Sequence, residues 1–171
     1  MNDKTYMKQA IDLAKNAQGL ASPGAMVGCV IVKKDEIVGT GSYTYDGIKH
    51  AEILALEEAG NRAQGGTAYV SLEPCSHDGR TPPCAEALIT AGISRLVTAM
   101  EDPYPAVRGN GLARLRKAGI EVACGTLAKE AELLNEKFIR YVKSGIPFGI
   151  LKVAMSLDGK IATSSGESQW I

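Results

Sequence analysis

The sequence predicts an α/β fold, a three-layer α/β/α sandwich with a mixed central sheet. An amphipathic helix and a hairpin open the chain, and from residue 67 onward short apolar strands alternate with helices, an order that indicates parallel strands joined by crossovers. The chain has 171 residues, of which 45% are apolar and 22% charged. This composition is typical of a globular domain with a buried core.

The first elements follow from the spacing of apolar residues. Intervals of three and four predict a helix over residues 3–18, which we expect to end at Gly19. Two β-rich runs, at residues 27–32 and 37–43, are separated by polar residues and predict an antiparallel hairpin. A second helix fits residues 50–59.

The second half of the chain alternates strands with helices. The predicted elements are a strand at 67–71, a helix at 83–91, a strand at 95–100, a helix at 109–118, a strand at 120–124 and one long helix at 129–143. This alternation predicts a partly parallel sheet with right-handed crossovers, covered on both faces.

The chain after residue 144 reads as a linker followed by a new strand. A Gly-Ile-Pro sequence precedes an apolar run at 148–155, and a Gly/Ser-rich stretch follows it. We therefore expect a first domain over residues 1–144, with residues 145–171 forming a linker and the first strand of a truncated second domain.

Charge and hydropathy exclude several classes of protein. The 19 basic and 19 acidic residues cancel, so the chain lacks the electrostatic footprint of a nucleic-acid binder. Its longest apolar runs are about six residues, against the roughly 20 that cross a bilayer. The first residues mix charges and lack a continuous apolar run, so we do not expect them to form a signal peptide. We expect a cytoplasmic protein with no nucleic-acid or membrane partner.

Three metal-ligating residue types stand where predicted elements begin or end. His50 opens the second helix, Cys75 follows a strand, and Cys84 lies at the start of the third helix. Such positions favour a thiolate, and one imidazole with two thiolates is a set that zinc prefers. Three protein ligands leave one position for water, which is typical of one catalytic zinc. Cys29 and Cys124 have no ligand types nearby, and we expect them to be core residues.

Glu52 is the expected catalytic residue. It stands two positions after His50, so its carboxylate can reach a water at the metal without being a ligand. Zinc deaminases combine a His-x-Glu element with a later Pro-Cys element, and their glutamate acts as general acid and base. In this chain eight residues separate Cys75 from Cys84.

Four more residues are candidates for substrate contacts. Arg80 and Thr81 offer a cation and a hydroxyl suited to a phosphate oxygen, and His77 lies in the same loop. Asp102 follows a strand, at the sheet edge where α/β proteins bind ligands. A solvated loop, an exposed histidine and a turn cap are equally ordinary explanations of these residues.

Three blocks of sequence resemble a known family. The blocks at 27–32, 50–52 and 72–84 are similar to the deaminase domain of the bifunctional riboflavin biosynthesis deaminase-reductases, and the loop that ends in Gly-Arg-Thr-Pro-Pro-Cys is specific to that branch. The resemblance implies a cytidine deaminase-like fold. It also implies hydrolytic deamination of 2,5-diamino-6-(5-phosphoribosylamino)pyrimidin-4(3H)-one, a small-molecule substrate.

The resemblance implies roles for the same residues. His50, Cys75 and Cys84 would hold zinc, and Glu52 would carry the proton to the leaving amine while ammonia departs. Because relatives associate through helices that flank the sheet, we expect a homo-oligomer.

The C-terminal residues resemble the first strands of the family's reductase domain. There the family binds NADP at positions matching Ala154 and Trp170 and substrate at the position of Ser168. We expect NADP binding and reductase activity only with a complete reductase domain.

Two departures from the family keep other functions open. The family commonly has asparagine where this chain has Gly24, and again where it has Tyr104. The alternatives are a deaminase of another nucleotide or base, and an inactive zinc-binding scaffold for a reductase.

Overall fold

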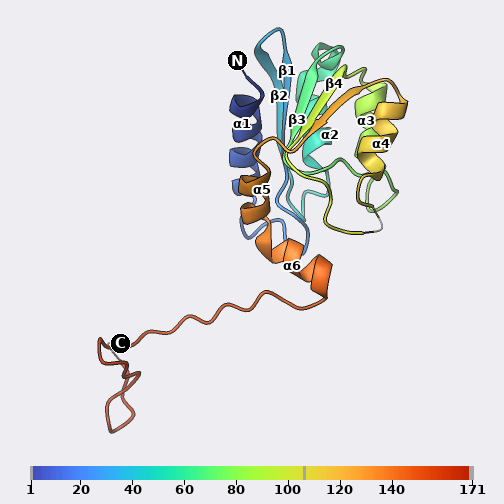
Figure 1. Cartoon of the computed structure of the whole chain (residues 1–171). Helices are drawn as coiled ribbons and strands as arrows, with labels where there is room; N and C mark the ends of the chain where they lie inside the picture. The colour runs from blue at the N-terminus through green and yellow to red at the C-terminus, as the bar shows by residue number, and fades with distance from the viewer. Residues whose placement is uncertain (1, 106, 170–171) are drawn as a thin grey trace.

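The computed structural model describes residues 2–105 and 107–169 (Figure 1). Its elements are α1 (Asp3–Lys15), β1 (Gly28–Lys33), β2 (Glu36–Ser42), α2 (Ala51–Ala59), the 3₁₀ helix η1 (Gly60–Ala63), β3 (Thr67–Val70), α3 (Cys84–Thr90), β4 (Arg95–Thr98), α4 (Asn110–Lys117), β5 (Glu121–Cys124), α5 (Ala128–Leu134) and α6 (Glu136–Ser144). Among the described residues, no helix has both the length and the apolar character needed to cross a bilayer.

The strands form one mixed sheet in the order β2-β1-β3-β4-β5. Strand β1 is antiparallel to both β2 and β3, whereas β3, β4 and β5 run parallel. Helices α1 and α5 pack on one face of the sheet, and α2, α3 and α4 pack on the other (Figure 1). The predicted three-layer α/β/α sandwich with a mixed sheet is therefore confirmed.

Both faces of the sheet are buried, so the central strands are continuous apolar runs. In β1, Cys29 and Ile31 join the core beneath α2 and α3, while Val30 and Val32 join the core beneath α1. This alternation is the two-residue period of a strand. Cys29 is buried, as expected.

Three sequence predictions were wrong. The predicted helix at 129–143 is two helices, because Asn135 leaves the helical backbone conformation between α5 and α6. The predicted strand at 148–155 is exposed chain that extends away from the domain, since no neighbouring strand pairs with it among the described residues (Figure 1). Cys124 is exposed rather than in the core because it ends β5 at the edge of the sheet.

Helix α2 lies unusually close to β2. A Cβ atom added to Gly41 would lie 2.0 Å from the backbone oxygen of Ala51, and one added to Gly39 would lie 2.1 Å from that of Ala55. Only glycine permits this approach, which fixes where the first turn of α2 sits on the sheet.

We predict that Gly41→Ala displaces the start of α2. Backbone atoms would have to move to admit the methyl group, so the free energy of unfolding should fall by about 1–3 kcal/mol in urea titrations. Gly149→Ala is the control, because a Cβ there would meet nothing within 4 Å. Equal stability of the two variants would contradict the close packing.

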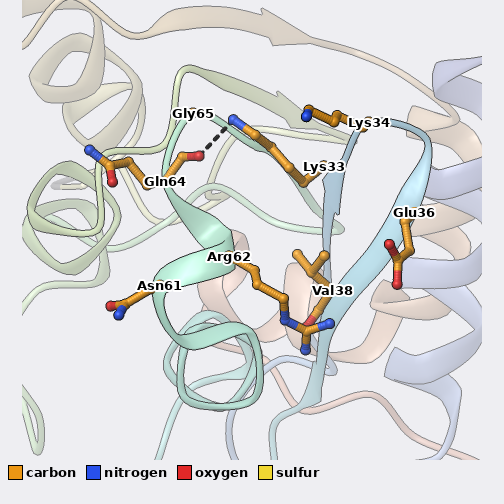
Figure 2. Close-up of a pocket in the computed structure, with 8 residues that line it drawn as sticks. All are labelled: Lys33, Lys34, Glu36, Val38, Asn61, Arg62, Gln64 and Gly65. Carbon is orange, nitrogen blue, oxygen red and sulfur yellow. Dashed lines mark hydrogen bonds between the residues drawn. The ribbon is translucent and has the colours of Figure 1, made fainter.

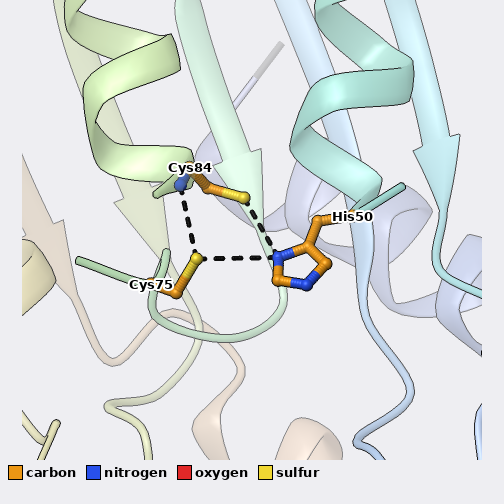
Figure 3. Close-up of side chains that lie close together, drawn as sticks. All are labelled: His50, Cys75 and Cys84. Carbon is orange, nitrogen blue, oxygen red and sulfur yellow. Dashed lines mark hydrogen bonds between the residues drawn. The ribbon is translucent and has the colours of Figure 1, made fainter. Parts of the chain in front are cut away.

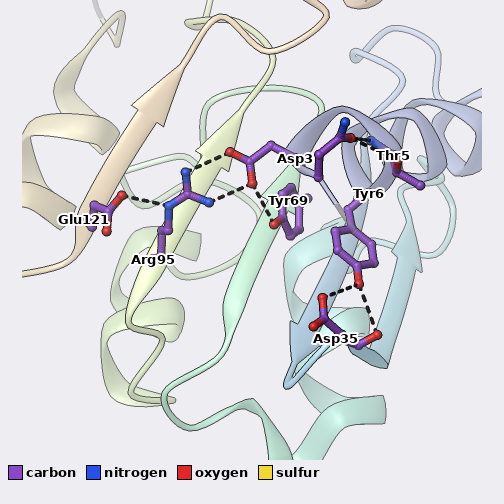
Figure 4. Close-up of polar contacts among 8 residues, drawn as sticks. Asp3, Thr5, Tyr6, Asp35, Tyr69, Arg95 and Glu121 are labelled. Atoms are coloured by element: carbon purple, nitrogen blue, oxygen red, sulfur yellow. Dashed lines mark hydrogen bonds and ion pairs between the residues drawn. The ribbon is translucent and has the colours of Figure 1, made fainter.

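An ion-pair network fastens α1 to the sheet (Figure 4). Asp3 in the first turn of α1 accepts two 2.8 Å hydrogen bonds from the Arg95 guanidinium of β4, which also bonds Glu121 of β5. The hydroxyl of Tyr69 donates to Asp3 at 3.0 Å. The Arg95 hydrogen bonds lower the pKa of Asp3, and burial raises the pKa of Tyr69 to about 12.

We predict that Asp3→Asn destabilises the protein in a pH-dependent way. The pKa of Asp3 in the folded state lies below its ordinary value of 3.8, so its ion pair stabilises the fold above that pH and is lost as the pH falls. Urea titrations should show a difference from wild type at pH 7 that shrinks below about pH 4. Asp12→Asn, whose partners Lys8 and Lys15 lie on the same exposed helix face, should have a smaller effect at pH 7.

Candidate active site

His50, Cys75 and Cys84 converge from three separate segments (Figure 3). Their ligand atoms all lie within 4.8 Å of one another. The His50 Nδ1 atom is 3.2 Å from the Cys84 sulfur and 3.6 Å from the Cys75 sulfur. The group is therefore compact enough to hold one metal ion.

The local folding of the chain explains this convergence. His50 is the residue that precedes α2, Cys84 is the first residue of α3, and Cys75 lies in the loop that follows β3. The backbone amide of Cys84 donates to the Cys75 sulfur at 3.3 Å, and the amide of Ala85 donates to the Cys75 carbonyl at 3.0 Å. Cys75 thus takes the place of a side-chain cap at the start of α3, where Pro83 supplies none.

The electrostatics of the group favour a thiolate. Hydrogen bonds from the Cys84 thiol and from His50 lower the pKa of Cys75 to about 4, and the bond to Cys75 in turn raises the pKa of His50. Deprotonated thiolate is the form of cysteine that binds metals. The donor set of one imidazole and two sulfurs is one that zinc prefers.

Glu52 lies beside the group in the first turn of α2. Its side chain is buried, with 3% of its surface exposed, and burial is the main reason that its pKa rises to about 7. It lines the same cavity as His50 and Cys75. The rings of Tyr43 and His50 pack at an interplanar angle of 86°, with 5.4 Å between ring centroids.

The cavity has a volume of about 320 Å³ and is lined by both polar and apolar side chains. Glu52, Asp102 and His77 contribute polar groups, and Phe138 comes from α6. The remaining lining residues are Gly24, Ala25, Val27, Tyr43, His50, Leu72, Glu73 and Cys75.

A larger cavity of about 540 Å³ lies near the turn between β1 and β2 (Figure 2). Lys33, Lys34 and Arg62 line it, and Lys33 already donates to the carbonyl of Gln64 at 2.7 Å. None of the residues of the metal group lines this cavity, so we assign the candidate site to the smaller one.

The other predicted contact residues divide between the site and elsewhere. His77 and Asp102 line the cavity. Arg80 is exposed and held by Tyr45, whose ring lies 4.3 Å from the guanidinium and whose carbonyl accepts a 3.1 Å hydrogen bond. The hydroxyl of Thr81 is buried and has no hydrogen-bond partner among residues 2–105 and 107–169.

Two of the three predicted cofactor and substrate residues of the C-terminal segment are described, and both lie outside the cavity. Ala154 and Ser168 are exposed on the chain that leaves the domain (Figure 1). Trp170 lies outside the described residues. None of the residues that the structure describes in this segment lines the candidate site.

Comparison with known proteins identifies the family. Residues 1–100 match the zinc-binding region of cytidine and deoxycytidylate deaminases. The chain belongs to this family. This match, together with the RibD relatives described next, confirms the resemblance of the blocks at 27–32, 50–52 and 72–84.

The most informative relatives are riboflavin biosynthesis proteins. RibD of Escherichia coli is 53% identical over 171 residues, which cover 100% of this chain and 47% of the relative. The structure of Acinetobacter baumannii RibD is 51% identical with a TM-score of 0.94, covering 99% of this chain and 48% of that one.

A second solved structure comes from Thermotoga maritima and is described as a diaminohydroxyphosphoribosylaminopyrimidine deaminase/5-amino-6-(5-phosphoribosylamino)uracil reductase. It is 45% identical with a TM-score of 0.91, covering 99% of this chain and 49% of that one. The chain thus spans about half the length of these relatives.

Sequence reasoning missed Glu73, which organises one side of this deaminase-family site. Its buried carboxylate accepts hydrogen bonds from four backbone amides, those of Asp102, Gly109, Gly111 and Leu112, at 2.8 to 3.3 Å. It therefore caps the start of α4 and holds the loop that carries Asp102 at the cavity. A charged residue at the end of an apolar strand is the sequence signal that could have revealed it.

We predict that Glu73→Gln lowers the free energy of unfolding by about 2 kcal/mol, because an amide nitrogen would replace an acceptor that faces backbone donors. Urea titration would measure the loss. Glu86→Gln is the matched control, since Glu86 pairs with Arg114 on the surface and should cost less than about 1 kcal/mol. Equal losses in the two variants would contradict the capping role of Glu73.

Proposed function

We propose that the chain catalyses the zinc-dependent hydrolysis of 2,5-diamino-6-(5-phosphoribosylamino)pyrimidin-4(3H)-one to 5-amino-6-(5-phosphoribosylamino)uracil and ammonia, a step of riboflavin biosynthesis. One observation carries the proposal. The group of His50, Cys75 and Cys84 shares a cavity with a buried carboxylate, Glu52, two residues after the histidine. RibD relatives that share 51–53% sequence identity with the chain support the assignment of this substrate.

The donor set fits zinc. Two sulfurs and one imidazole nitrogen are soft enough for it, and the low pKa of Cys75 keeps a thiolate available at neutral pH. Zinc, when bound, is a Lewis acid that lowers the pKa of water to about 7. With three protein ligands, a fourth coordination position stays open for chemistry.

Glu52 is the proposed proton carrier. Its position in the first turn of α2 places the carboxylate in the cavity beside the ligand group, where burial keeps bulk water from competing. A carboxyl there can take a proton from the attacking water and deliver it to the departing amine. Tyr43 holds the ring of His50 by an edge contact, so the ligand stays oriented.

The substrate's polar groups would find partners in the lining of the cavity. Asp102 and His77 can accept or donate hydrogen bonds to the heterocycle or the ribose. Arg80 and Thr81 stand in the same loop as His77 and are the proposed phosphate contacts, because Arg80 carries a positive charge and the hydroxyl of Thr81 has no partner among the described residues.

One observation favours a second candidate, the deamination of another nucleotide or base. Gly24 lines the cavity, so the amide side chain that the family commonly has at this position is missing from the wall itself. Loss of one hydrogen bond to a substrate changes its affinity by about 0.5–1.5 kcal/mol. Retention of Glu52 in the cavity argues against an inactive scaffold.

We predict that zinc-loaded protein releases ammonia from the diaminopyrimidinone ribosyl phosphate, and that Glu52→Gln binds zinc but loses turnover by about 100-fold or more. Ammonia release would be measured beside cytidine and deoxycytidylate. A preference for either of these would support the second candidate. An active Glu52→Gln variant would overturn the role of Glu52.

The same preparations test the ligands. Zinc content should fall in His50→Ala and Cys84→Ala, because each removes one of three ligands. Cys124→Ser is the matched control, since Cys124 is exposed and outside the group. Unchanged zinc in the ligand variants would overturn the assigned set.

A further inference from the structure

Asn135 has an unusual place between α5 and α6. Its side chain is buried, with 2% of its surface exposed, and it bonds the backbone of Met26, 109 residues away. The Oδ1 atom accepts from the Met26 amide at 2.8 Å, and the Nδ2 atom donates to the Met26 carbonyl at 3.0 Å.

These two hydrogen bonds use both functions of the amide side chain. One acceptor and one donor match one backbone N–H and one C=O, as a neighbouring strand would. Aspartate would lose the donor, and alanine would leave both backbone groups of Met26 without these partners in a partly buried setting. The chemistry at position 135 is therefore specific to a primary amide.

The segment that Asn135 holds is a wall of the active-site cavity. Ala25 and Val27, the two neighbours of Met26, both line it. Phe138, one helical turn after Asn135, lines the same cavity from α6. One side chain thus fixes two parts of the wall relative to each other, the residues before β1 and the start of α6.

The residues of this wall that line the cavity have apolar side chains. Ala25, Val27 and Phe138 carry hydrocarbon side chains, whereas Glu52 and Asp102, which line the same cavity, carry carboxyl groups. A planar heterocycle with amino and carbonyl groups on its rim fits this division, because its rim needs polar partners and its faces pack on apolar or aromatic surfaces.

We propose that Asn135 is a positioning residue for the substrate cavity, and that Phe138, which it places, is a specificity-determining residue for the heterocycle. The specificity role of Phe138 rests on the proposed deaminase function, whereas the positioning role of Asn135 does not. Neither residue is among the metal ligands, so the pair governs substrate affinity and leaves the metal centre and the proton carrier in place.

Amide hydrogen exchange tests the positioning role without any substrate. In Asn135→Ala the amide of Met26 should exchange faster by about ten-fold or more, because its acceptor is gone. The amides of Val30 and Ile31 in the paired strand β1 should keep their wild-type rates. Equal acceleration at all three sites would show general destabilisation and overturn the positioning role.

Steady-state kinetics test the specificity role, using whichever of the diaminopyrimidinone ribosyl phosphate, cytidine or deoxycytidylate the wild type hydrolyses best. Asn135→Ala and Phe138→Ala should raise KM by about ten-fold, with kcat within about two-fold of wild type and full zinc content. Tyr141→Ala is the matched control on the same helix, since 56% of Tyr141 is exposed. A fall in kcat or zinc with unchanged KM would overturn the proposal.

Two further variants complete the test. Phe138→Leu keeps an apolar side chain of similar size, so it tests the specificity role even where Asn135→Ala does not fold. It should raise KM by about three-fold if the aromatic face packs on the heterocycle. In the double variant that combines Asn135→Ala with Phe138→Ala, the fold-rise in KM should be less than the product of the two single fold-rises, because Asn135 acts partly through Phe138. A full product would overturn that link. If none of the three compounds is hydrolysed, the proposed function fails, and the exchange rates still decide the role of Asn135.

Discussion

The close approach of α2 to β2 is the constraint on which the site depends. With glycine at positions 39 and 41, the backbone of the helix lies against the strand, so the helix cannot slide or tilt without a clash. His50 and Glu52 stand at the start of that helix. Cys75 follows β3 of the same sheet. The distance of His50 and Glu52 from Cys75 is therefore fixed by backbone packing rather than by the side chains themselves. The metal group inherits the rigidity of the core.

The site buries two carboxyl groups in different ways. Glu73 meets four backbone amides, so its charge is matched by donors that belong to the fold. Glu52 has less compensation, and its pKa rises to about 7 as a result of burial. The two buried glutamates that line one cavity thus differ in their surroundings: Glu73 holds a loop through backbone donors, whereas Glu52 has the raised pKa that suits the proton transfer proposed for it.

The features that could be predicted from the sequence are those that depend on the spacing of nearby residues. Apolar periodicity gave the layers and the mixed sheet, and the ligand types at element boundaries gave the group of His50, Cys75 and Cys84. The sequence did not predict the break at Asn135, because the bond that holds this residue is to Met26, far away along the chain. The run at 148–155 has strand composition, but composition cannot supply the partner strand that pairing needs.

The difference between local motifs and long-range contacts also separates the residues proposed for the reaction from those proposed to select the substrate. His50, Glu52 and Cys75, which line the cavity, stand in short local motifs. The wall of the cavity combines residues before β1 with Phe138 of α6, which meet only in the folded chain. Short motifs therefore carry the residues of the proposed chemistry, whereas the residues proposed to select the substrate are brought together by contacts between distant segments.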